Sequence, residues 1–153
     1  MKLRTRKATE TDVPRMWEIR RDSILTRAPR GMTLAQAETW ANSMAVEGME
    51  QRFRDAEVWV AEADDTITAW IALRGDYIDG LYTDPRFVER GIGTKLVVLA
   101  ETLMRERGIQ IIRLDASINA EQFYLRRGFV PKGSRVPDSA TPMEKRLFTT
   151  GSK

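Results

Sequence analysis

Two closely spaced glycines, Gly91 and Gly93, lie where a predicted strand passes into a predicted helix. Glycine has no Cβ, so the backbone there can adopt a positive φ angle and can approach a phosphate oxygen closely. The helix that follows directs unpaired N–H groups and the positive end of its dipole at the same point. This junction therefore has the chemistry of a pyrophosphate-binding loop. A tight turn that binds no ligand explains the two glycines equally well.

Three other nucleotide-binding patterns do not fit this loop. The GxGxxG dinucleotide motif requires a third glycine at the position of Leu96. A Walker A loop requires the order Gly-Lys-Ser/Thr, whereas the chain has Gly93-Thr94-Lys95 and lacks the first glycine of that motif. The set of motifs that marks protein kinases is absent as well.

Two segments resemble the GCN5-related N-acetyltransferase (GNAT) family. The acetyl-CoA loop of that family has the pattern Gln/Arg-x-x-Gly-x-Gly/Ala, and the matching run is Val88-Glu89-Arg90-Gly91-Ile92-Gly93. Val88 departs from the pattern because it offers no side-chain donor, although it keeps the backbone N–H through which the family loop mainly acts. The second segment, Asn119–Phe129, is similar to the family segment that runs from Asn through Phe-Tyr to Gly-Phe, and it begins 26 residues after Gly93. The resemblance extends from about Leu3 to Phe148.

The resemblance implies acetyl-CoA as a co-substrate and no metal. In the family, the pantetheine arm enters a gap between two splayed strands, which here end at Thr83 and near Ala116, and it pairs with backbone there like an added strand. The resemblance implies that Asn119 hydrogen-bonds the pantetheine or the adenosine-side backbone. Asn119 is also a favourable helix cap, and both roles can hold together. The residues that match the cofactor-binding positions are Leu81, Tyr82, Thr83, Val88, Glu89, Arg90, Gly91, Ile92, Gly93, Thr94, Asn119, Phe123 and Tyr124.

Tyr124 matches the family tyrosine that lies near the sulfur of CoA. The resemblance therefore implies that Tyr124 protonates the departing thiolate, which a phenol can do without first carrying a charge. The alternative role is a core tyrosine packed under Phe129. The backbone N–H of about Tyr82 or Thr83 would stabilise the oxyanion of the intermediate.

The base that removes the proton from the amine is a separate question. Asp79 is in phase with Tyr77 and Leu81 on its predicted strand, so it is our candidate for a carboxylate that faces the cleft. Asp115, Glu62 and an ordered water are rivals. A surface carboxylate without a catalytic role also explains each of these acids.

The chain contains neither cysteine nor histidine. It therefore has no thiolate nucleophile, no cysteine metal site, and neither the usual base for neutral pH nor the commonest metal ligand. A direct transfer within a ternary complex is favoured over a covalent cysteine intermediate. The net charge of +3 suits an anionic ligand, but the basic residues are scattered in short groups, which argues against a nucleic-acid surface.

The length of 153 residues predicts a single domain, which we place at residues 1–148, with a flexible tail at residues 149–153. No apolar run is long enough to span a bilayer, and no signal peptide precedes the first strand. We therefore expect a cytoplasmic protein without a membrane or nucleic-acid partner. The resemblance adds a homodimer as a common assembly of such proteins.

The hydrophobic pattern predicts an α/β (α+β) fold with a mixed sheet, and the resemblance implies that this fold is of the GNAT type. We expect a mixed sheet of about six or seven strands, antiparallel in its first half, with a central splayed parallel pair and about four flanking helices. The predicted strands are Leu3–Ala8, Val58–Ala63, Thr66–Leu73, Asp76–Thr83, Ile109–Ala116, a segment from Phe129, and Met143–Phe148. The predicted helices are about Asp12–Arg27, Leu34–Met44, Ile92 to Gly108 and Asn119–Arg127, with a further short segment at Glu47–Arg54.

The leading hypothesis is an acetyl-CoA-dependent N-acetyltransferase that acts on a small-molecule amine or a peptide. In the family, the helices that precede the second strand form one wall of the acceptor site, so Trp40, Met44 and Phe53 are candidates for that wall, although core packing also explains each of them. The alternative hypothesis is a non-catalytic domain of the same fold that binds or senses acyl-CoA. The departure at Val88 and the lack of an obvious base keep that alternative open.

Overall fold

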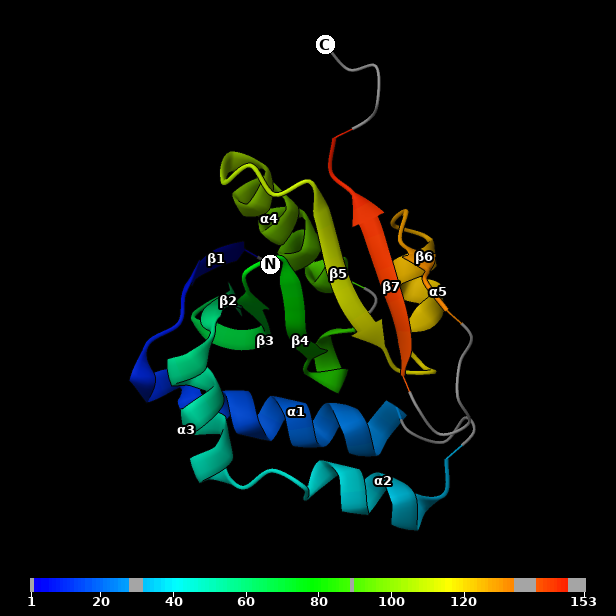
Figure 1. Cartoon of the computed structure of the whole chain (residues 1–153). Coiled ribbons are helices and arrows are strands. Elements are labelled where there is room, and N and C mark those ends of the chain that lie inside the picture. Colours follow the sequence, from blue (N-terminus) through cyan, green and yellow to red (C-terminus); the bar gives the residue numbers. More distant parts are fainter. Residues whose placement is uncertain (1, 28–31, 89, 134–139, 149–153) are drawn as a thin grey trace.

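The computed structural model describes residues 2–27, 32–88, 90–133 and 140–148 (Figure 1). Within these ranges the strands are β1 (Leu3–Lys7), β2 (Glu57–Ala63), β3 (Thr66–Arg74), β4 (Tyr77–Thr83), β5 (Ile111–Ala116), β6 (Val130–Pro131) and β7 (Thr141–Arg146). The α-helices are α1 (Val13–Arg27), α2 (Leu34–Ala41), α3 (Val46–Asp55), α4 (Ile92–Glu106) and α5 (Glu121–Leu125). Short 3₁₀ turns lie at η1 (Glu10–Asp12) and η2 (Pro85–Phe87). No helix in the described ranges is long and apolar enough to cross a membrane.

The strands form one mixed sheet in the order β1-β2-β3-β4-β5-β7-β6. β4 and β5 pair in parallel, and every other neighbouring pair is antiparallel. The predicted fold class is therefore confirmed, with seven strands and five α-helices in the described part of the chain. The predicted tail at residues 149–153 lies outside the described residues.

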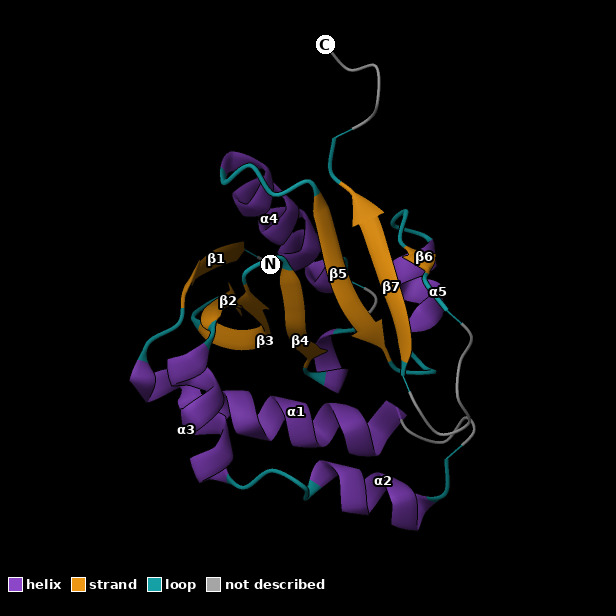
Figure 2. Cartoon of the chain, in the orientation of Figure 1, coloured by secondary structure: helices purple, strands orange, loops and turns teal. Residues whose placement is uncertain are grey.

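Helices cover both faces of the sheet, and each face has its own apolar cluster (Figure 2). α4 and α5 pack on one face, where Leu96, Ile112 and Phe129 are almost fully buried. α1 and α3 pack on the other face around Trp70, whose indole N–H donates to the Met16 carbonyl oxygen at 2.9 Å. α2 packs against α1, and the two helices run side by side in Figure 1. The sheet is thus held rigidly from both sides, apart from the region where its central strands separate.

The parallel pair at the centre of the sheet is short. Only Tyr77 with Arg113 and Ile78 with Leu114 are paired, after which β4 and β5 diverge. A bulge between Ala72 and Leu73 shifts the register of β3 against β4 near the same point. The last residues of β4 consequently pair with β3 on one side only, and α4 makes the crossover from the end of β4 to β5.

Local sequence signals explain several element boundaries. Thr33 and Gln36 form a capping box at the start of α2, because the Gln36 N–H donates to the Thr33 hydroxyl and the Gln36 side chain accepts from the Thr33 N–H. The predicted helix Leu34–Met44 is too long, since α2 ends at Ala41, and its first residue, Leu34, is 69% exposed. The helix has few turns, and only its Ala37 and Ala41 side is buried.

The turn between β2 and β3 gives a test of local backbone strain. Asp64 and Asp65 adopt φ angles of 49° and 69°, the positive values that a two-residue hairpin turn requires. Because glycine adopts such angles without strain, we expect Asp65→Gly to raise the free energy of unfolding by about 1 kcal/mol. Urea denaturation checks this prediction. Asp65→Ala, which removes the same carboxylate but keeps the strain, is the control, and equal stability of the two variants would contradict it.

Candidate functional site

A cleft of about 110 Å³ opens where β4 and β5 separate. Its walls come from the C-terminal half of α1, from α2, from the end of β4, from the first turn of α4 and from the segment that leads into α5. The lining residues are Ser23, Ile24, Trp40, Leu81, Tyr82, Thr83, Gly93, Ser117, Asn119, Ala120, Phe123 and Tyr124. The structure therefore brings most of the predicted cofactor residues to one place, although they lie up to 43 positions apart between Leu81 and Tyr124.

The end of β4 supplies unpaired backbone to this cleft. The Asp84 N–H donates to the Thr68 carbonyl oxygen on β3 at 2.8 Å. Since backbone groups alternate in direction along a strand, the N–H of Tyr82 points toward β3 and the N–H of Thr83 points toward the gap. The separation of β5 thus leaves a main-chain edge on which an extended ligand could pair.

The glycine loop follows directly. Gly91 has a φ of 77° and is the N-cap of α4, and a Cβ built on it would meet nothing within 4 Å. Gly93 is close to a neighbour instead, because a Cβ there would lie 3.3 Å from the Phe123 ring. Open space therefore lies over the first glycine, beside the first-turn N–H groups that have no partner within the helix.

The other predicted loop residues surround these glycines. Ile92 is buried in the core below the loop, whereas the Arg90 side chain is exposed and its guanidinium lies 5.5 Å from the Phe87 ring centroid. Val88 is partly buried and extended. Glu89 lies outside the described residues.

Asp84 anchors the start of the loop. Its carboxylate is almost fully buried and accepts hydrogen bonds from Arg15 of α1 at 2.5 Å, from the Arg86 side chain at 2.8 Å and from the Arg86 N–H at 2.9 Å. Burial raises the pKa of Asp84, but the hydrogen bonds from Arg86 and Arg15 outweigh it and hold that pKa well below its usual range. The chain that enters the loop is therefore tied to α1 by the ionised carboxylate of Asp84 and to β3 by the Asp84 N–H.

Tyr124 lies between the core and the cleft. Its side chain is 6% exposed and makes edge contacts with the rings of Phe123 and Phe129, with centroid distances of 5.1 and 5.4 Å. Burial and the nearby Tyr82 raise the pKa of Tyr124 above its ordinary value, so the phenol is protonated at neutral pH. Packing under Phe129 and lining the cleft are thus compatible, and no hydrogen-bond partner of the hydroxyl occurs among the described residues.

Residues 28–147 match the sequence profile of the acetyltransferase (GNAT) domain. The chain belongs to the GNAT family. A relative from Escherichia coli K12, the uncharacterised N-acetyltransferase YafP, is 31% identical over 80 residues, which are 52% of this chain and half of the relative's own length.

Solved structures of the GNAT family superpose on almost the whole chain. A GCN5-related N-acetyltransferase from Rhodopseudomonas palustris is 27% identical with a TM-score of 0.89, over 95% of this chain and 96% of that chain. The PaiA N-acetyltransferase from Thermoplasma acidophilum, solved with coenzyme A, has a TM-score of 0.83 at 24% identity, over 95% of this chain and 99% of that chain. The fold of this GNAT domain is therefore shared with structures that span it nearly end to end.

The carboxylates that sequence analysis named as candidate bases lie outside the lining of the GNAT cleft. Asp79 is bound to Arg52 of α3, whose Nε lies 3.2 Å from the carboxylate and whose Nη2 donates to the Asp79 carbonyl oxygen at 3.2 Å. Asp115 is exposed on β5 and accepts from the Tyr77 hydroxyl.

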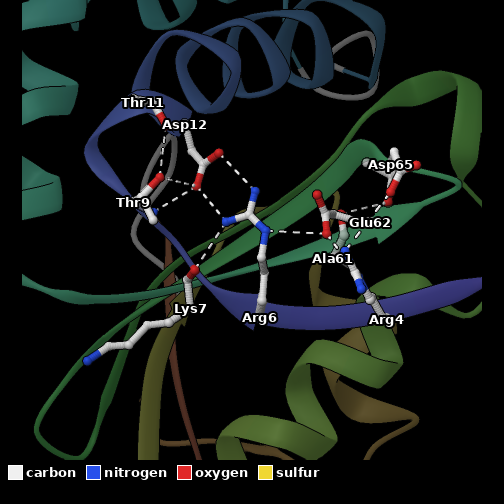
Figure 3. Close-up of polar contacts among 10 residues, drawn as sticks. Arg4, Arg6, Lys7, Thr9, Thr11, Asp12, Ala61, Glu62 and Asp65 are labelled. Carbon is white, nitrogen blue, oxygen red and sulfur yellow. Dashed lines mark hydrogen bonds and ion pairs between the residues drawn. The ribbon is translucent and has the colours of Figure 1, made fainter.

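Glu62 is separated from β4 by β3 and belongs to a different ion-pair group. Figure 3 shows it between Arg4 and Arg6, with the Nε of each 3.3 Å from the carboxylate. Arg6 also binds Asp12, which in turn accepts from the Thr9 N–H at the start of α1 (Figure 3). The hydrogen bond from Arg6 lowers the pKa of Glu62 despite its burial. Glu62 therefore binds β1 to its own strand, β2, and the role of base stays a prediction for Asp79.

Several residues of the cleft were not found from the sequence. Ser23 and Ile24 come from α1, and Ser117 and Ala120 come from the segment after β5. Their types carry no chemical signal, and only the packing of α1 beneath the separated strands reveals them. Of the three residues proposed for the acceptor wall, Trp40 lines the cleft, whereas Met44 and Phe53 pack against the cluster around Trp70.

The Asp84 anchor predicts a stability change that depends on pH. Asp84→Asn should lower the free energy of unfolding by about 3 kcal/mol at pH 7, because it leaves Arg15 without its buried partner. The folded-state pKa of Asp84 lies below the unfolded value, so its contribution is complete above about pH 4 and is lost as the pH falls further. Urea denaturation of both proteins at pH 7 and at about pH 3 tests this. The prediction is contradicted if the difference in free energy of unfolding between wild type and variant is as large at about pH 3 as at pH 7.

Proposed function

We propose that this protein is an acetyl-CoA-dependent N-acetyltransferase that transfers an acetyl group directly to a primary amine of a small molecule or peptide. The observation that carries the proposal is the gap between β4 and β5, which has the glycine loop at one end and Tyr124 in its wall. Membership of the GNAT family supports it. So do structural neighbours solved with CoA or acetyl-CoA, including PaiA and YncA from Salmonella typhimurium.

The residues of the cleft fit this co-substrate. The space above Gly91 and the free N–H groups of the first turn of α4 would hold the pyrophosphate. The exposed backbone edge of Leu81, Tyr82 and Thr83 would pair with the amides of the pantetheine arm. Asn119 stands across the cleft from this edge, on the segment that follows β5.

The chain can then assist each stage of acyl transfer. The N–H of Thr83 points into the gap, so it is a better donor to the oxyanion than the N–H of Tyr82. Tyr124 protonates the departing sulfur as a neutral phenol in the wall of the cleft. The thioester itself supplies the activated acetyl group.

The amine loses its proton through water in this proposal. The described lining of the cleft contains no carboxylate, whereas Asp79 and Asp115 lie on the two strands that border the gap and are both reached by solvent. Asp79 remains our candidate for the final proton acceptor. Its carboxylate forms an ion pair with Arg52 at the edge of this site.

The acceptor amine would enter from the side of α1 and α2. Ser23, Ile24 and Trp40 form that wall, so the described part of the acceptor side offers apolar surface and one hydroxyl. This composition favours a compact, mainly apolar amine. The cytoplasmic location and the homodimer stay predictions from the sequence.

Titration calorimetry with acetyl-CoA tests the cofactor site. We expect micromolar binding to the wild type and a loss of at least about tenfold in Gly91→Ala, whose new Cβ occupies the space for the pyrophosphate. Gly75→Ala is the matched control, because Gly75 also has a positive φ, of 59°, with nothing within 4 Å, but lies at the turn between β3 and β4. A wild type that does not bind, or equal losses in both variants, would contradict the proposed site.

Tyr124→Phe distinguishes an enzyme from a sensor domain. We expect kcat for amine acetylation to fall by roughly 100-fold while the Kd for acetyl-CoA is kept, because phenylalanine preserves the packing and removes only the proton donor. The release of free thiol, measured across a panel of amines, gives kcat. Tyr82→Phe removes a second phenol of the same cleft as a control. Full activity of Tyr124→Phe would exclude the acid role, and no turnover by the wild type would favour the sensor.

A further inference from the structure

The guanidinium of Arg127 is held firmly at the C-terminal end of α5. Its Nε donates to the Thr94 hydroxyl at 2.8 Å, and its Nη1 donates to the Phe123 carbonyl oxygen at 2.6 Å. Nη2 also donates to the Thr94 hydroxyl. The same group lies over the Phe123 ring, 3.6 Å from the ring centroid. These contacts fix the position of the charge without neutralising it.

No carboxylate balances this charge within the described ranges of the chain. Two other partly buried arginines do have such partners, since Arg6 pairs with Asp12 and Arg15 pairs with Asp84. Arg127 instead contacts a hydroxyl, a carbonyl and a ring, and the adjacent charged residue is another cation, Arg126. Burial and Arg126 together lower the pKa of Arg127. A partly desolvated cation in this situation gains strongly from an anion.

The surroundings of Arg127 add positive potential. Thr94 belongs to the first turn of α4, where N–H groups without partners inside the helix create the positive end of the helix dipole. The Phe123 ring under the guanidinium also packs against Gly93 of the loop. The guanidinium therefore lies one side chain away from the proposed pyrophosphate loop.

We propose that Arg127 is a specificity residue that binds a phosphate group of the CoA co-substrate, in addition to the backbone of the glycine loop. This inference rests on the proposed function. A phosphate that bridges the first turn of α4 and the Arg127 guanidinium would neutralise two positive groups that nothing else in the described chain neutralises. The phosphate is either one of the pyrophosphate groups or the 3′-phosphate of the ribose.

A purely mechanical role for Arg127 would give different results. In that role the side chain clamps α5 to α4 through Thr94, and its charge is irrelevant to binding. Lysine keeps the charge but cannot reproduce the three hydrogen bonds of the planar guanidinium. Arg127→Lys therefore separates attraction of a phosphate from clamping, and Arg127→Gln removes both.

The test is calorimetric titration with CoA and with 3′-dephospho-CoA. We expect Arg127→Gln to weaken CoA binding by at least about tenfold at low salt, with a smaller loss at roughly 1 M salt, where charges are screened. Arg127→Lys should retain most of the affinity. A loss confined to CoA would assign the 3′-phosphate, and an equal loss with 3′-dephospho-CoA would assign the pyrophosphate. Arg126→Gln, which removes the same charge from the adjacent exposed residue, should weaken binding much less.

Thermal unfolding without ligand confirms that each variant is folded. If Arg127→Gln does not fold, the comparison of Arg127→Lys with Arg126→Gln decides, and Arg127→Lys should then bind at least as tightly. Three results would overturn this inference alone: unchanged affinity in Arg127→Gln, a loss independent of salt and shared by Arg127→Lys, or an equal loss in Arg126→Gln. A wild type that binds neither ligand would overturn the proposed function and this inference with it.

Discussion

The separation of two parallel strands is the constraint on which the rest of this structure depends. β4 and β5 share only two residue pairs before they diverge, and a bulge between β3 and β4 lies beside that point. Because β4 is still held by β3, the divergence leaves a backbone edge that has no partner strand. α4 must start at the end of this edge and return to β5, so its N-terminus and its glycine loop are placed at the mouth of the gap. A cleft for an extended ligand follows from these connections before any side chain is considered.

Fixed charges hold the loop at its two ends. At the start, the buried carboxylate of Asp84 draws Arg15 of α1 and the backbone of Arg86 together, so that the loop begins from a rigid point. At the far end, Arg127 reaches Thr94 from α5. The charges of Asp84 and Arg15 balance each other, whereas Arg127 has no carboxylate partner in the described part of the chain. The Asp84 anchor holds one side of the loop in place, and Arg127 leaves a positive charge on the other side. An anionic ligand would supply the negative charge that Arg127 lacks.

The chemistry proposed for the cleft depends on burial rather than on unusual residue types. Because the chain has no cysteine or histidine, the groups proposed for catalysis are a buried phenol, backbone N–H groups and water. Burial keeps Tyr124 protonated, and the alternation of backbone groups along β4 directs the Thr83 N–H toward the reacting centre. Asp79, the acid that sequence reasoning favoured, is bound by Arg52 at the edge of this site. Proton removal through water suits a thioester substrate, whose activated carbonyl needs little help from a strong base.

The sequence by itself determined the elements and their order. Hydrophobic periods, the Thr33 capping box and the Asp64-Asp65 turn are local signals, and each is read from neighbours within about four positions. The glycine loop and the Asn119–Phe129 segment likewise indicate the family from the sequence alone. Only the tertiary structure decided that Leu34 is exposed, that Asp79 meets Arg52 and that Ser23 lines the cleft. Periodicity specifies which face of an element is apolar, but the partner of that face depends on how the helices pack. The same is true of Arg127 and Thr94, which lie 33 positions apart and meet because α5 packs against the first turn of α4.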